Sequence, residues 1–369
     1  MVVAQCGTGG RVMNNTARKD LWERLRKNGL VEGDTPSVAS APWYVRLMLG
    51  IAGWIGALFI LGFVGAGFAM VMQSSAAATV AAIVCSGAAY AIFRMAAKGD
   101  FASQFGLATG LVGQVLFGVA IFKQFHSGES AGFFLCFCVE VAFTLLMPNF
   151  MHRIFTTLAA VAALSLGLAQ AGLHGFALPL TAAGCAAVWR GETRLATRTD
   201  LWQPVGYGLA LGVLQTATTS LLGGEALSFF HRNGNNWLQR HGTEVGTALV
   251  AVVFLAVAVQ ILRELDISIS SSEGIAILSC AVVVLAASFP THGLAAAALI
   301  LIIGFAGGNR ILFGLGLLAL ASFLSHYYYQ MNETLLVKSL ILGVIGILLL
   351  AGRWGIRSLF PVMEAKEHA

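Results

Sequence analysis

The sequence predicts an all-α fold, a polytopic transmembrane helix bundle of about 12 spans with both termini in the cytoplasm (N-in/C-in). Three observations predict it: the composition, the length of the apolar runs, and the placement of Lys and Arg. Of the 369 residues, 57% are hydrophobic and 11% are charged, whereas a soluble domain carries about 25% charged residues. This excess of apolar side chains has to face lipid or other apolar helices.

Apolar runs long enough to cross a bilayer recur along the chain. A helix needs about 20 mostly apolar residues to cross a hydrocarbon layer of ~30 Å. Some runs are short, including the pair on either side of Pro290, so the alternative is a count of about 11 or one re-entrant hairpin. Pro179 lies inside one run and is expected to kink it, because its ring removes a backbone donor. The predicted spans are 46–72, 76–95, 101–122, 131–147, 153–171, 174–189, 203–222, 244–263, 273–289, 291–307, 310–324 and 334–352.

Lys and Arg collect on one side of these spans. With the N-terminus inside, all but four of the 22 Lys and Arg lie in cytoplasmic segments. Lys123, Arg232 and Arg240 lie outside, and Lys338 lies within a span. This is the bias of the positive-inside rule. Because the basic residues are spread over short loops and do not form one patch, no nucleic-acid partner is expected.

The chain divides into three segments. Residues 1–42 form a cytoplasmic tail with a basic amphipathic helix, residues 43–355 form the multipass domain, and residues 356–369 form a second cytoplasmic tail. The first 40 residues contain no apolar stretch like that of a cleavable signal peptide. The first span is therefore expected to direct membrane insertion.

The helix predicted in the N-terminal tail has one apolar face. Leu21, Trp22 and Leu25 share that face, and Lys and Arg surround it. A helix of this kind lies on the anionic inner leaflet of a membrane, with the lipid bilayer as its partner. Docking of a partner protein is the alternative.

Glu140 is the one carboxylate deep within a predicted span. A carboxylate there costs a few kcal/mol (about 2.5–3.5) or more unless it is paired, hydrated or protonated. Gln114 lies at a similar depth in the preceding span, so a hydrogen bond between the two side chains is expected if their helices are neighbours. One hypothesis is that Glu140 titrates during a transport cycle. The alternative is a neutral Glu140 that only ties helices together.

Lys338 completes the candidate intramembrane polar site of Glu140, Gln114 and Lys338. It lies about one turn from the outer end of the predicted last span. Its long side chain can snorkel to the interface. It can instead reach inward to a carboxylate such as Glu140.

The motifs of common catalytic and metal sites do not occur in the sequence. There is no P-loop, no Gly-x-Ser-x-Gly elbow and no His-Glu-x-x-His. Cys136 and Cys138 lack the C-x-x-C spacing of zinc and redox sites. His231 and His241, in a predicted outer loop at 223–243, have no standard metal spacing. No catalytic residue, metal or cofactor is therefore predicted, and an enzyme is the least favoured class.

The end of the chain has a recognisable pattern. Residues 327–339 read Tyr-Tyr-Tyr-Gln-Met-Asn-Glu-Thr-Leu-Leu-Val-Lys-Ser, and a glycine-punctuated apolar run follows at 340–350. This pattern resembles the end of a bacterial membrane family catalogued as domain of unknown function 4401, and of the related family numbered 2157. The segment 25–31 is similar to the short lead before the first span in such proteins.

This resemblance implies an integral protein of the bacterial cytoplasmic (inner) membrane. Members of the family are often encoded beside a small membrane-anchored protein with a Gly-Asp-Tyr motif, which suggests a partner. The family brings no established catalytic residues. It places Lys338 inside the recognisable motif, which favours a role for this lysine beyond snorkelling.

Two functions remain open. The first hypothesis is a multipass envelope scaffold or assembly partner, motivated by the basic N-terminal helix and the family resemblance. The alternative is a secondary transporter or channel that uses Glu140, motivated by the number of spans and the buried carboxylate. Transport requires the carboxyl group of Glu140, whereas a scaffold tolerates an amide there.

The topology predicts the location of fused reporters. A compartment-sensitive reporter fused after Gly242 is expected to report the outside, and one fused after Arg194 the inside. Reporter activity in whole cells measures both. The reverse pattern would contradict the predicted orientation.

Overall fold

The computed structural model describes residues 22–29, 48, 51–52, 55–56, 74–95, 100–125, 129–191, 198–226, 237–288, 293–330 and 336. It divides into two units, Met1–Ile51 and Ala52–Ala369. In the first unit residues 22–27 are helical, and Trp22 and Leu25 are less exposed than the charged residues beside them. Lys338, most of the first predicted span and all but Leu336 of the last lie outside the described residues.

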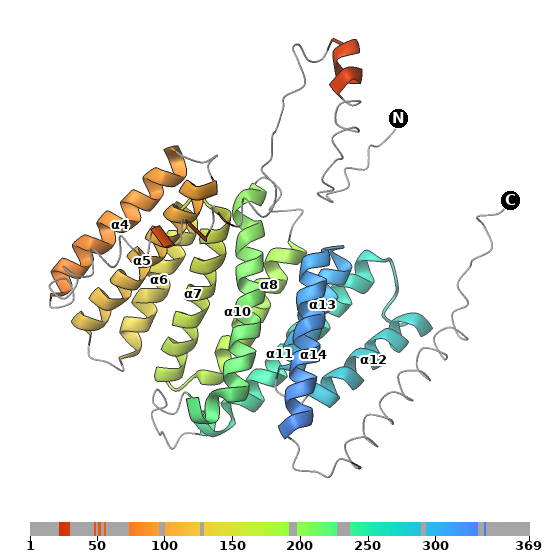
Figure 1. Cartoon of the computed structure of the whole chain (residues 1–369). Coiled ribbons are helices and arrows are strands. Elements are labelled where there is room, and N and C mark those ends of the chain that lie inside the picture. The colour runs from red at the N-terminus through yellow and green to blue at the C-terminus, as the bar shows by residue number, and fades with distance from the viewer. Residues whose placement is uncertain are drawn as a thin grey trace. The chain divides into compact units, whose positions relative to one another are not determined.

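All regular elements of the described part of the second unit are helical (Figure 1). Each predicted run from 76–95 to 310–324 coincides with a helix, so the all-α fold class is confirmed. Five of the described helices are long and apolar enough to cross a membrane, and three more are shorter apolar helices. The total of about 12 spans stays a prediction. The elements are α4 Ser75–Met95, α5 Asp100–Gln124, α6 Ser130–Leu146, α7 Phe150–Gln170, the 3₁₀ turn η1 His174–Phe176, α8 Ala177–Arg190, α10 Thr199–Ala226, α11 Trp237–Glu264, α12 Ser272–Ser288, α13 Leu294–Ala306 and α14 Arg310–Gln330.

The positions of two residues, Pro179 and Gly242, differ from the sequence prediction. Pro179 lies in the first turn of α8, where a backbone N–H has no partner within the helix, so the expected cause of a kink is missing. Gly242 lies within α11 and outside any loop, because α11 begins at Trp237. The first turns of α11 are polar, so their hydropathy resembles that of a loop although they are helical.

Neighbouring helices pair as hairpins. The most extensive contacts are those of α4 with α5, α6 with α7, and α13 with α14. Helix α10 packs on both α7 and α8, and α8 and η1 pack on α11. One hydrophobic cluster fills the space among α8 and α10 to α14, and a smaller one, around Phe93, Leu107 and Phe143, joins α4, α5 and α6.

At one end of the helices, hydrogen bonds and an ion pair join residues that are far apart in the sequence. Asn149, before α7, bonds to Ser103 near the start of α5. Arg153 donates from Nη1 to the carbonyl oxygen of Asp200 at 2.8 Å, which joins the starts of α7 and α10. Arg190 and Glu264 form an ion pair that joins the ends of α8 and α11.

This end carries most of the described arginines, and we call it the arginine end. Lys123 and Arg240 lie near the opposite end, on α5 and α11. The helices therefore separate basic residues into two unequal groups. The arginine end is defined by Arg94, Arg153, Arg190, Arg198, Arg263 and Arg310.

Helices α7 and α10 approach closely at a glycine. A Cβ at Gly208 would lie 2.6 Å from Cβ of Thr157 and 2.9 Å from the carbonyl oxygen of Ile154. Gly208→Ala is expected to lower the free energy of unfolding by about 1–3 kcal/mol, because the methyl group overpacks this contact. Thermal unfolding in mild detergent measures the change.

Gly118→Ala is the matched control. Gly118 also lies within a helix, but a Cβ there would meet no heavy atom within 4 Å. Alanine is there expected to be neutral or to stabilise by up to about 1 kcal/mol. Equal melting temperatures for the two variants would contradict the close packing.

Candidate intramembrane polar site

The structure describes two of the three predicted site residues. Glu140 lies on α6 and is 9% exposed, and Gln114 lies on α5 and is 7% exposed. Both are thus buried among apolar helices, as their positions in the apolar runs predict. The position of Lys338 relative to them stays a prediction.

Gln114 does not bond to Glu140, so that expected pair is wrong. Its amide Nε2 lies 3.2 Å from Nε2 of His152 on α7. Helix α5 packs chiefly on α4, and α6 packs chiefly on α7. Equal depth in the membrane fixes the level of a side chain but not the helix that it faces, and the nearest polar partner of Gln114 lies on α7.

His152 lies where four helices meet. Its side chain is fully buried. Phe93 of α4 and Phe143 of α6 contact the imidazole edge-on, with ring centroids 5.7 and 6.5 Å away. On α5, Gly110 leaves the space for the ring, because a Cβ there would lie 2.6 Å from Nε2 of His152.

The first turn of α7 fixes the position of His152. Asn149 caps the helix, and its side-chain oxygen accepts the backbone N–H of His152 at 3.0 Å. The amide nitrogen of Asn149 donates to the hydroxyl of Ser103 on α5 at 3.3 Å. The same residue therefore starts α7 and ties this start to α5.

Two threonines bridge α6 and α7 between His152 and Glu140. The hydroxyl of Thr144 donates to that of Thr156 at 2.9 Å. Thr144 can also donate to the carbonyl oxygen of Glu140 at 2.9 Å, and Thr156 to that of His152 at 3.0 Å. The two contacts of Thr144 are alternatives, because its hydroxyl has one proton, whereas Thr156 can accept from Thr144 while it donates to the carbonyl oxygen of His152.

Three buried polar atoms of the site have no hydrogen-bond partner among the described residues. They are Oε2 of Glu140, Nδ1 of His152 and the hydroxyl oxygen of Ser86 on α4. The donor and acceptor roles of the Gln114 amide and Nε2 of His152 depend on the tautomer of the imidazole. Buried polar atoms are nearly always bonded, so each of these is notable. Elsewhere in the described residues, such atoms also occur in Ser165, Trp189, Arg190, Gln215 and His326.

These groups can hold and pass a proton. A carboxyl group and an imidazole are side chains that give and take protons in proteins, and hydroxyls can donate and accept hydrogen bonds beside them. The described residues contain no group of three or more His, Cys, Asp and Glu side chains arranged to hold a metal ion. The sequence interpretation did not identify His152, because it lies at the edge of an apolar run beside Arg153 and resembles an interfacial residue.

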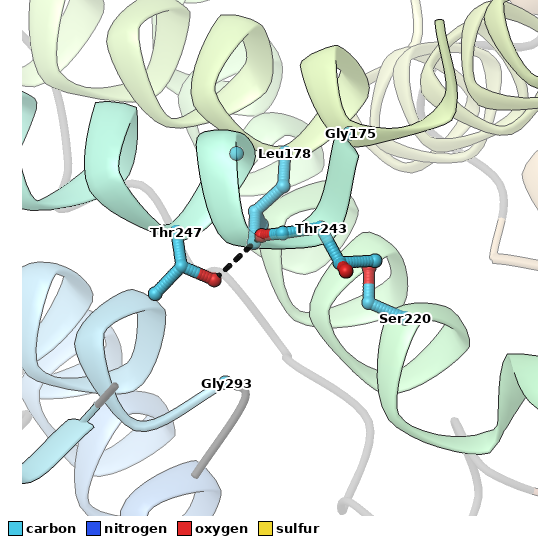
Figure 2. A pocket seen from close by; sticks show the side chains of 7 residues that line it. Gly175, Leu178, Ser220, Thr243, Thr247 and Gly293 are labelled. Carbon is cyan, nitrogen blue, oxygen red and sulfur yellow. Dashed lines mark hydrogen bonds between the residues drawn. The ribbon is translucent and has the colours of Figure 1, made fainter. Parts of the chain in front are cut away.

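A pocket at the opposite end of the helices is less promising (Figure 2). Gly175, Leu178, Ser220 and Thr247 are among its lining residues. The Thr247 hydroxyl donates to the backbone oxygen of Thr243 at 2.9 Å, which Figure 2 marks, and that of Ser220 donates to Thr216 O at 2.8 Å. The pocket lining contains no charged side chain.

Comparison with known proteins gives the family. The model of a family described as a domain of unknown function, DUF4401, matches residues 42–358. The chain belongs to that family. No curated protein and no solved structure matches this DUF4401 protein. The match covers the whole buried site and the segment that contains Lys338, so the resemblance at the end of the sequence is confirmed.

Loss of the Gln114 amide is expected to destabilise this DUF4401 protein. Gln114→Leu leaves the buried imidazole without a hydrogen-bond partner, and an unsatisfied buried group costs about 1–3 kcal/mol. Thermal unfolding in detergent measures the loss. Gln203→Leu, at an exposed position on α10, is the control and is expected to change little. A Gln114→Leu variant as stable as this control would contradict the hydrogen bond.

Proposed function

We propose that this multipass protein of the bacterial cytoplasmic membrane binds and releases a proton or small cation at Glu140, as part of a secondary transporter or channel. One observation carries the proposal. The carboxyl group is buried, and its Oε2 has no partner among the described residues. An ionisable residue inside a membrane helix is a functional candidate by default.

The cost of Glu140 argues against a purely structural role. An acidic side chain near the centre of a membrane helix costs about 2.5–3.5 kcal/mol on insertion scales. A carboxyl group that only tied helices together would offset this cost with hydrogen bonds to both oxygens. Among the described residues Oε2 of Glu140 has no hydrogen-bond partner, and the hydroxyl of Thr144, one turn away, bonds to the backbone oxygen of Glu140 and not to its carboxyl group. A group that must gain and lose an ion requires this freedom.

The distribution of charge supports the orientation. The arginine end gathers six described arginines, whereas Lys123 and Arg240 lie near the other. We place the arginine end in the cytoplasm, as the positive-inside rule requires. With an even number of spans, both termini then lie inside. Lys338 would be near the outer surface in the last span, within reach of either the interface or Glu140.

A second candidate function rests on the N-terminal helix. Trp22 and Leu25 are partly buried while Glu23, Arg24, Arg26 and Lys27 are exposed, as in a helix with one apolar face. Such a helix can lie on anionic lipid or bind a partner. An envelope scaffold or assembly factor would use it to hold a small membrane-anchored protein encoded nearby. Stoichiometric co-purification of such a protein in mild detergent would favour this candidate.

Glu140→Gln is expected to abolish ion movement while the protein stays folded, because the amide keeps the shape but cannot titrate. The wild type and the variant are reconstituted into liposomes containing a pH-sensitive dye, and a potassium diffusion potential is applied. The wild type should acidify the lumen, and Glu140→Gln should match liposomes without protein. Glu129→Gln, an exposed carboxylate before the same helix, is the control. Equal flux through all three proteins would contradict the proposal.

A further inference from the structure

Glu140 is only 9% exposed, so the ion of the proposed function can reach its carboxyl group only if neighbouring helices part. The described helices around it form two hairpins, α4 with α5 and α6 with α7, which lie side by side (Figure 1). Contacts of α5 with α6 and α7 are far less extensive than its contacts with α4. We call the boundary between the two hairpins the seam.

Within each hairpin the helices approach too closely to separate easily. A Cβ at Gly113 of α5 would lie 2.4 Å from the hydroxyl of Ser86 on α4. A Cβ at Gly167 of α7 would lie 3.3 Å from Cβ of Phe133 on α6. Interiors packed this closely shift between discrete arrangements and resist continuous deformation. Each hairpin is therefore expected to move as one body.

The seam is apolar and tightly packed at the end opposite the arginine end. Phe122 of α5 and Phe133 of α6 meet edge-on there, with ring centroids 4.8 Å apart. A Cβ at Gly132 of α6 would lie 3.4 Å from Cβ of Phe125, which follows α5. Separation of these groups would expose aromatic surface to water or leave a void, and both are unfavourable. This end of the seam is suited to act as a hinge.

Polar side chains cross the seam toward the arginine end. Nε2 of Gln114 on α5 lies 3.2 Å from Nε2 of His152 on α7. Nδ2 of Asn149 donates to the hydroxyl of Ser103 on α5 at 3.3 Å. Water can replace both contacts at a small net cost, because a hydrogen bond within the protein is exchanged for one with the solvent. Two atoms would also gain a partner from water, since Nδ1 of His152 and Oε2 of Glu140 have none among the described residues.

From this difference between the two ends we infer that the hairpins part at the arginine end, about the aromatic contacts as a hinge, and that this opening connects Glu140 to the cytoplasm. The structure is then the closed form. His152 and Gln114 are positioning residues that hold it closed, since the imidazole fills the space at Gly110 and has to leave it on opening. The inference rests on the proposed function and gives its ion site an entrance.

Thiol labelling tests the opening. Leu107 of α5 is 3% exposed, in the cluster that joins α4, α5 and α6. Leu107→Cys is made in the full-length protein without its six native cysteines. Inverted and right-side-out membrane vesicles then receive a cationic methanethiosulfonate reagent that does not cross membranes, and mass spectrometry follows the reaction.

Leu107→Cys is expected to react from the cytoplasmic side alone. In inverted vesicles it should react about 10–1,000-fold more slowly than a fully accessible cysteine, because minor forms are populated at roughly 0.1–10%. Asp266→Cys, at an exposed position just after α11 at the arginine end, supplies that reference. In right-side-out vesicles neither variant should react.

Cys185, kept as the single cysteine of another variant, is the matched control. It is fully buried near the end of α8, in the larger hydrophobic cluster, and should stay unreacted from either side. If Leu107→Cys does not fold, Met147→Cys takes its place, because Met147 is also 3% exposed and belongs to the same small cluster.

Gln114→Leu is expected to favour the open form. Added to Leu107→Cys, it should speed the reaction from the cytoplasmic side by roughly 5–100-fold, because His152 then lacks its partner in the closed form and finds water in the open one. Cys185 should stay unreacted beside Gln114→Leu, which distinguishes an opening of the seam from a general loss of structure. Protein modified at Leu107→Cys in inverted vesicles and then reconstituted should carry no flux, since the reagent obstructs the entrance.

The outcomes separate the two proposals. No reaction at either Leu107→Cys or Met147→Cys, reaction from the side opposite to Asp266→Cys, equal reaction of Cys185, or normal flux in the modified protein would overturn the entrance. An unchanged rate in Gln114→Leu would overturn the role of His152 and Gln114. If Glu140→Gln still abolished the flux into liposomes, the proposed function would stand without the entrance. Reaction as expected together with equal flux in the wild type and Glu140→Gln would overturn the proposed function, and with it the opening as an entrance to Glu140.

Discussion

The imidazole of His152 occupies a space that exists only because residue 110 on the neighbouring helix is a glycine. Around this ring α4, α5 and α6 all contact the first turn of α7. The close approach continues at Gly113, where a Cβ would lie 2.4 Å from the hydroxyl of Ser86. In lipid no water reaches such a junction to satisfy polar atoms. The arrangement of the site therefore depends on how closely the backbones approach.

Most other buried hydroxyls in the described helices bond within their own helix. Thr157, Thr181 and Thr216 each donate to a backbone oxygen three or four residues earlier, at 2.7–3.0 Å. Polar residues of this kind need no neighbour and add little information about function. Glu140 and His152 differ, because a carboxyl oxygen and a ring nitrogen cannot be satisfied in this way. Their unpartnered atoms are consequently stronger evidence than their burial alone.

The sequence predicted the helices well and the neighbours of Gln114 poorly. Hydropathy and run length locate a helix such as the one predicted at 76–95, because a long apolar run has to be surrounded by apolar groups. The structure has this helix at 75–95. They fail at the first turns of α11, where polar residues such as Gln239 are helical but resemble a loop. They also cannot identify His152 as the partner of Gln114, since pairing across helices depends on crossing geometry and on the glycine at 110.

The site divides the α4–α7 region into two unlike halves. Toward the arginine end, α6 and the start of α7 carry Asn149, Thr156 and Thr144, whereas Phe122, Phe133 and Phe134 pack beyond Glu140. A pore would need a polar path on both sides of the carboxyl group. The proposed transporter would instead use alternating access, in which a second arrangement opens the other side around a fixed ion site. The tight contacts of the aromatic rings with Gly132 and Gly167 argue that such an opening moves whole helices, because packed interiors shift between discrete states more readily than they deform. Glu140 lies between the polar and the aromatic residues, and in the proposed transporter it would hold the ion.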